Sequence, residues 1–200
     1  MSENIDTILQ FWFGSASDDM TTAEQNGSKW WKKDPAVDRE IRDRFAGALD
    51  DATSGQLDDW LGTARGRLAM IILVDQFSRN IYRDSPRAYA NDALALAWCK
   101  DGLASGVEGG LRAIERVFLY LPLEHSESVE DQIRSVQLFG ALARGVPVEQ
   151  RKLFDDYLNY AQRHLDIVQQ FGRFPHRNAI LGRESTEGEI AFLQQPGSSF

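Results

Sequence analysis

The sequence predicts an all-α protein. Apolar residues recur at three- and four-residue spacing along most of the 200 residues, and no segment shows the alternation that a convincing strand would have. Asp34-Pro35 and Ser85-Pro86 each place a capping residue before a proline, which is a typical helix start. The connections are short, so neighbouring helices should pack as antiparallel hairpins. We expect about seven or eight helices in one domain over residues 1–200.

The N-terminal half should begin with a helix over residues 5–13, whose apolar stripe ends at Gly14. Residues 15–29 are polar and are expected to form a loop. Three further helices are predicted from their capping residues, and they run from Asp34 to Gly55, from Thr63 to Tyr82 and from Ser85 to Gly102.

In the C-terminal half, a helix that starts near Leu111 should end before Pro122, because proline blocks continuation of a helix. Ser126 is expected to cap the next helix, which runs to Gly145. A long helix should then cover residues 148–171, and Thr186 should begin the last one as part of a capping box.

Composition excludes several classes of function. Apolar residues make up 42% of the chain, as in globular proteins. The net charge is −8, which argues against nucleic-acid partners and against anionic membrane surfaces. The one cysteine excludes an internal disulfide, and neither a secretory signal nor a membrane-spanning run is recognisable. We therefore expect a soluble cytoplasmic protein.

Polar residues gather at two predicted helix ends. Asp75, Arg79 and Asn80 follow a fully apolar run, so they need partners if they are buried. Glu124 and His125 lie on the elbow after Pro122, where a helix N-terminus would favour a neutral imidazole. Either group could instead be structural, as an Asp75–Arg79 pair and a capping elbow.

A third polar cluster occupies the break between the last two helices. It contains Arg173, His176, Arg177, Asn178 and Arg183. The planar guanidinium fork suits carboxylates and phosphates, so a basic segment in an acidic chain suggests an anion site. The alternative is that these arginines pair internally with acidic residues and lock helices together.

The remaining reactive side chains favour structural roles. His164 shares an apolar stripe and is expected to be a core residue with its polar needs met. Cys99 lies in an apolar context and should contribute packing only. No metal-ligand spacing is present, and we expect neither a metal nor another cofactor.

These polar segments resemble the bacterial family known as domain of unknown function 924. The resembling motifs extend over nearly the whole chain and are Leu9–Gly14, Trp30–Trp31, Asp75–Tyr82, Phe118–Glu127, Phe171–Asn178 and Leu181–Arg183. Ser78 stands where the family pattern usually has proline. The resemblance implies an all-α fold like that of tetratricopeptide-repeat domains, and it implies no activity.

Our leading hypothesis is a pocket for a small anionic molecule where the three clusters converge. His125 or His176 would be the acid–base group, oriented by Glu124 or Asp75. The side chains expected to hold the ligand are Arg79, Asn80, Arg173, Arg177, Asn178 and Arg183. A second hypothesis is an interaction module whose groove binds a peptide or a protein tail, and a third is a buried network without any ligand.

Overall fold

The computed structural model describes residues 3–198, and the regular elements within this range are all helical, which confirms the predicted fold class. The α-helices are α1 Ile5–Phe13, α2 Asp19–Trp31, α3 Pro35–Thr53, α4 Ala64–Ile71, α5 Ser78–Ile81, α6 Asp92–Ser105, α7 Ala113–Glu124, α8 Val129–Gly145, α9 Arg151–Phe171 and α10 Glu187–Leu193. Short 3₁₀ turns lie at Asp58–Gly62, Pro86–Tyr89, Val107–Gly110 and Pro175–Arg177.

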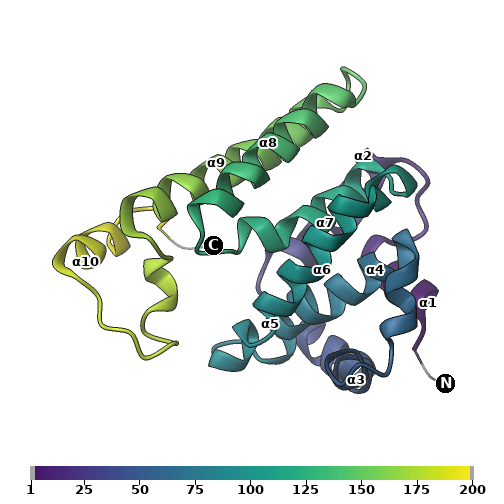
Figure 1. The fold of residues 1–200 in the computed structure, drawn as a ribbon, viewed down its shortest axis with the longest axis horizontal. Coiled ribbons are helices and arrows are strands. Elements are labelled where there is room, and N and C mark those ends of the chain that lie inside the picture. The colour runs from purple at the N-terminus through teal and green to yellow at the C-terminus, as the bar shows by residue number, and fades with distance from the viewer. Residues whose placement is uncertain (1–2, 199–200) are drawn as a thin grey trace.

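Helices α1 to α7 form the body of the molecule, and α8 and α9 form a long hairpin beside it (Figure 1). One apolar core extends through α1 to α9, while a small separate cluster joins the end of α9 to Phe174. Within residues 3–198, no helix combines the length and apolar composition needed to cross a membrane. The tetratricopeptide-like stacking and the single domain remain predictions.

Several predicted helix ends are confirmed by their hydrogen bonds. The Asp34 carboxylate accepts from the backbone N–H groups of Ala36 and Val37 at the start of α3. Thr63 caps α4, and Thr186 forms the expected capping box with Glu189. Capping residues thus locate helix starts well, because each satisfies backbone donors that the first helical turn leaves without partners.

The predicted loop over residues 15–29 is wrong, since most of this segment is helix α2. Its N-cap is Asp18, and its buried face contains Thr22 and Asn26 as well as apolar residues. The amide of Asn26 donates to the backbone oxygens of Phe13 and Thr22. A polar side chain can lie in a core when it bonds to the backbone. The buried face of α2 therefore includes polar residues, and the sequence shows no apolar stripe from which this helix could be predicted.

Pro122 does not end α7, which continues to Glu124. The proline lies in the last turn of the helix, so it removes one backbone hydrogen bond close to an end that is already incomplete. The predicted cap at Ser126 is also wrong, because Ser128 caps α8 and accepts from the N–H of Asp131. His125 therefore lies at the C-terminal end of α7, and not at a helix N-terminus.

The predicted helix from Thr63 to Tyr82 contains a π-helical stretch at Ile72–Phe77, between α4 and α5. Both flanks keep right-handed helical backbone, so the chain runs on without a break. A π-helical turn changes the direction of the side chains after it, and such turns are common at functional sites. Here the stretch contains the buried Asp75.

The start of α4 depends on a close backbone approach at Gly66. A Cβ atom there would lie 2.1 Å from the Trp60 carbonyl oxygen and 2.8 Å from Thr63 Oγ1. We therefore expect Gly66→Ala to lower the free energy of unfolding by roughly 1–3 kcal/mol in urea denaturation. At Gly62 a Cβ would meet no atom within 4 Å, so Gly62→Ala is the matched control. Equal losses in the two variants would contradict the expected crowding.

Candidate functional site

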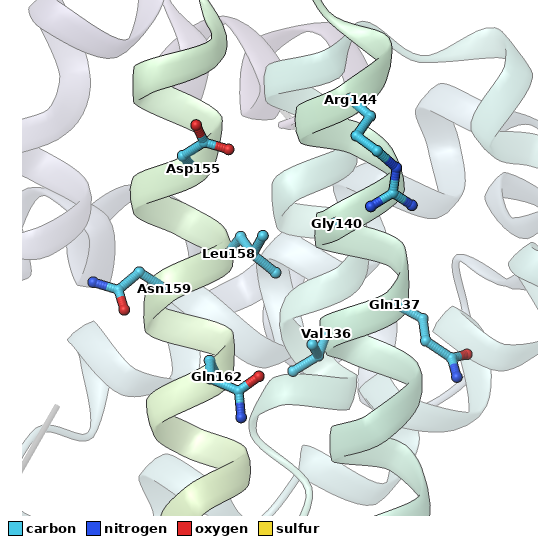
Figure 2. Close-up of a pocket in the computed structure, with 8 residues that line it drawn as sticks. All are labelled: Val136, Gln137, Gly140, Arg144, Asp155, Leu158, Asn159 and Gln162. Carbon is cyan, nitrogen blue, oxygen red and sulfur yellow. The ribbon is translucent and has the colours of Figure 1, made fainter.

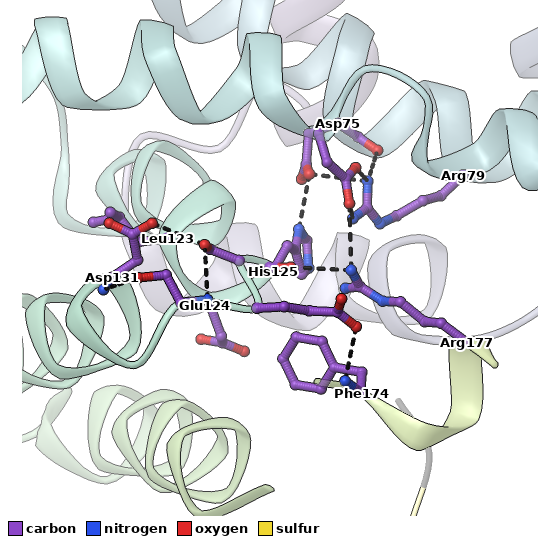
Figure 3. A network of polar contacts seen from close by, with 12 residues as sticks. Asp75, Arg79, Leu123, Glu124, His125, Asp131, Phe174 and Arg177 are labelled. Carbon is purple, nitrogen blue, oxygen red and sulfur yellow. Dashed lines mark hydrogen bonds and ion pairs between the residues drawn. The ribbon is translucent and has the colours of Figure 1, made fainter. Parts of the chain in front are cut away.

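Asp75 is the centre of a buried polar network (Figure 3). Its Oδ1 atom lies 2.8 Å from His125 Nδ1 and 2.9 Å from Arg79 Nη1. The Gln76 amide donates to its second oxygen. Burial alone would raise the pKa of Asp75, but Arg79 and His125 lower it well below its usual range. The carboxylate is therefore ionised at neutral pH.

Asp75 also determines which proton His125 carries. An ionised carboxylate only accepts hydrogen bonds, so Nδ1 of His125 must be the protonated nitrogen. Burial, followed by the nearby Arg79 charge, lowers the pKa of His125. The neutral state anticipated from a helix N-terminus thus arises from burial and a neighbouring cation. Nε2 keeps its lone pair and makes no hydrogen bond with the other described residues.

Arg79 connects this pair to a second carboxylate, Asp92, at the start of α6. The Nη1 atom of Arg79 lies 3.0 Å from Asp92 Oδ1, and its Nη2 atom donates to Oδ2 at 3.2 Å. Arg79 also donates to the backbone oxygen of Asp75 at 2.8 Å. The side chains of Arg79 and Asp92 are 21% and 22% exposed, so solvent reaches this edge of the network.

The third predicted cluster reaches the network through Arg177. Its Nη1 atom donates to the backbone oxygen of His125 at 3.0 Å and lies 3.4 Å from Asp92 Oδ2. The guanidinium also packs against the rings of Tyr89 and Phe174, with centroid distances of 4.9 and 4.5 Å. The three polar clusters, which are far apart in the sequence, therefore meet in space.

Other residues of the third cluster support this arrangement from outside. Arg183 binds both oxygens of Glu127 at 2.7 and 2.9 Å and also donates to Asn178 Oδ1. Glu127 in turn accepts from the backbone N–H of Phe174. Arg183 and Asn178 thus hold the segment that carries Arg177 in place.

Two predicted ligand-binding residues bond elsewhere. Arg173 forms a two-bond pair with Glu189 of α10. Asn80 donates to Asp38 of α3, which also pairs with Arg83. Neither Arg173 nor Asn80 makes a hydrogen bond to the Asp75 network, so the network is smaller than the sequence suggested.

His176 lies in the 3₁₀ turn that also contains Arg177. Burial, together with the charge of Arg177, lowers the pKa of His176 to about 4. The imidazole is therefore neutral at pH 7. Within this network, the carboxylate of Asp75 orients the imidazole of His125.

Glu124 faces a different partner from the one predicted. Its Oε1 atom lies 3.2 Å from Nδ1 of His164 on α9, and that nitrogen is 2.8 Å from the Tyr160 backbone oxygen. Burial and then Asp75 raise the pKa of Glu124 to about 8, and burial lowers the pKa of His164 to about 3. At neutral pH the two groups are mainly uncharged, so their contact is not an ion pair. His164 is buried with bonded partners, as predicted.

The arginines do not form an unpaired positive patch. Arg79 and Arg177 contact Asp75 and Asp92, so two cations face two carboxylates at the centre of the network. Asp92 was not among the predicted site residues. It lies inside the helix predicted from Ser85 to Gly102, whereas the observed α6 begins at Asp92, and its contacts with two arginines depend on the tertiary fold.

A separate groove lies between α8 and α9 (Figure 2). It is an open groove with a volume of about 630 Å³, and it is lined by Val136, Gln137, Gly140, Arg144, Asp155, Leu158, Asn159 and Gln162. None of the predicted site residues lines this groove. Within residues 3–198 there is also no cluster of three or more histidine, cysteine or acidic side chains suited to a metal ion.

Comparison with known proteins places the chain among bacterial proteins of unknown function. A solved protein of unknown function from Agrobacterium tumefaciens is 36% identical, with a TM-score of 0.79, and the alignment covers 95% of this chain and 96% of that one. A search of curated proteins found no match. The model of the family described as "Bacterial protein of unknown function (DUF924)" matches residues 8–197. The chain therefore belongs to the DUF924 family.

Proposed function

We propose that the protein binds a small anionic molecule beside His125, Arg79 and Arg177. The observation that carries this proposal is the 2.8 Å contact between His125 Nδ1 and the buried Asp75 carboxylate. That contact fixes the imidazole and turns its basic Nε2 atom away from Asp75. Arg79 shares the Asp75 carboxylate with the imidazole, Arg177 donates to the backbone oxygen of His125, and both guanidinium groups contact Asp92.

The chemistry available at this site is proton transfer next to a bound negative group. A neutral histidine held by a carboxylate accepts a proton at Nε2, and the resulting imidazolium is stabilised by Asp75. The arginines would orient the ligand through charge-assisted hydrogen bonds. In this proposal His125 is the acid–base group, Asp75 orients it, and Arg79 and Arg177 hold the anion.

Two observations support the competing proposals. The pairing of Arg79, Arg177 and Arg183 with carboxylates favours a purely structural network. The groove between α8 and α9 favours an interaction module that binds a peptide, because its polar and apolar lining lies open on a hairpin. A ligand that contacts His125 distinguishes the first proposal from both of these.

The test is titration of the wild-type protein with acetate, phosphate and chloride at matched ionic strength, with the His125 imidazole followed by NMR. We expect acetate or phosphate, but not chloride, to shift the His125 resonances and to raise the Tm by mass action. Arg79→Gln should weaken this binding roughly 10- to 100-fold, since it removes a charge-assisted hydrogen bond worth about 1.5–3 kcal/mol.

The control is Arg151→Gln, at an exposed arginine that begins α9 and is distant from the network in sequence. Its affinity for the anion should equal that of the wild type. If neither acetate nor phosphate moves the His125 resonances, the small-anion proposal fails. The structural and peptide-binding alternatives would then remain.

A further inference from the structure

Two arginines in this protein, Arg83 and Arg173, use the same edge of the guanidinium group, formed by Nε and Nη2, to bind a carboxylate through two bonds. In Arg83 these atoms lie 2.6 and 2.7 Å from the two oxygens of Asp38. In Arg173 they lie 2.6 and 2.8 Å from the two oxygens of Glu189. The planar fork matches the spacing of carboxylate oxygens, so this is the preferred geometry of such pairs.

Arg177 differs from them because its Nε–Nη2 edge has no partner among the described residues. Its hydrogen bonds both leave from Nη1, to His125 and Asp92. Nε is buried and makes no hydrogen bond, although Arg177 is only 6% exposed. A buried donor of a charged group that lacks an acceptor is costly, so an acceptor supplied at this edge would stabilise the protein.

The orientation of this edge is held from several directions. Tyr89 and Phe174 pack against the guanidinium, and the bonds from Nη1 restrict its rotation. Arg183 and Glu127 fasten the segment that carries Arg177 to the start of α8. A fork positioned in this way loses little conformational entropy when it binds a ligand.

We infer that the Nε–Nη2 edge of Arg177 binds a carboxylate group, and that the ligand of this site is a small carboxylate monoanion. This inference rests on the proposed function and narrows its ligand class. Two oxygens in one plane complete the edge as Asp38 and Glu189 complete theirs. A single charge also suits the surroundings, because Asp75 and Asp92 already balance Arg79 and Arg177. A phosphate dianion would bring a second negative charge close to those two carboxylates.

The first measurement needs no variant. Acetate is titrated into the wild-type protein while the Nε–H resonance of Arg177 is followed by NMR, with phosphate and chloride at matched ionic strength for comparison. We expect acetate to shift this resonance in a saturable way, with an affinity at least about tenfold higher than that of phosphate. The Nε–H resonance of Arg173 should not move, because its edge is already occupied by Glu189.

The second measurement compares two conservative variants. Arg177→Lys keeps the charge and loses the fork, so acetate should no longer raise the Tm. Arg173→Lys is the matched control, and there the acetate-induced rise should remain. If Arg177→Lys does not fold, the wild-type Nε–H titration still decides the question.

The outcomes separate this inference from the proposed function. Phosphate that binds Arg177 as tightly as acetate would overturn the carboxylate class and leave a small-anion site. An anion that shifts His125 but not Arg177 would overturn the inference alone. If no anion shifts either residue, both the inference and the proposed function fail.

Discussion

Asp75→Asn should lower the free energy of unfolding by about 3 kcal/mol, which is among the largest losses expected for a change of one charge in this protein. Asparagine has nearly the same shape, so the effect comes from removing the charge that faces Arg79 and His125. Removal of one partner from a buried pair typically costs about 3–5 kcal/mol. The lower end applies here, because Arg79 keeps Asp92 as a partner and is about one-fifth exposed.

Urea denaturation at pH 7 measures this loss. The control is Asp156→Asn, which removes the acidic partner of the exposed pair with Lys152 and should change stability by less than about 0.5 kcal/mol. Similar small effects in both variants would mean that Asp75 contributes little to the fold. A large loss does not exclude a ligand, because a preorganised site needs a rigid network.

The fold class could be predicted because helix starts and apolar stripes are local signals. Asp34, Thr63 and Thr186 bond to backbone donors two or three residues ahead, so sequence spacing alone reveals them. Helix α2 could not be found in this way. Its buried Asn26 is stabilised by the backbone oxygen of Phe13, and that contact exists only after α1 and α2 have packed together.

The sequence predicted most residues of the candidate site, but not which of these residues contact one another. Asp75 and His125 were predicted as polar groups at helix ends and Arg177 as part of a basic loop segment, and buried polar groups need partners. Which partner each one takes depends on the π-helical stretch at Ile72–Phe77 and on the continuation of α7 through Pro122. Both features depend on packing around them, because a π-helical turn has no clear sequence signal and a proline usually ends a helix.

Glu124→Gln should stabilise the protein progressively as the pH rises from 4.5 to 7. The pKa of Glu124 is raised to about 8 in the folded chain, from about 4.5 in an unfolded one. A group with a raised pKa holds its proton in the native state, so its contribution is complete below pH 4.5 and is lost as the pH approaches 8. Glutamine does not titrate. Between pH 4.5 and 7 the free energy of unfolding of Glu124→Gln, relative to that of the wild type, should therefore increase by about 3 kcal/mol.

The measurement is urea denaturation of the wild type and of Glu124→Gln at several pH values, read as the difference between the two proteins. His164 and His176, whose pKa values are lowered to about 3 and about 4, weaken both proteins below pH 6.5 because the unfolded chain takes up protons there. Reading the difference largely removes this shared effect. Glu149→Gln, which makes the same replacement at an exposed position, is the matched control.

A constant difference for Glu124→Gln would contradict the expected protonation of Glu124. It would mean that Glu124 is ionised in the folded protein, and the nearby group able to balance that charge is His164, at 3.2 Å. The contact between α7 and α9 would then be a buried ion pair. In that case His164→Asn should be strongly destabilising, since it would leave the carboxylate buried without a cation. With both groups neutral, the same substitution should cost only a hydrogen bond and some packing, about 1–2 kcal/mol.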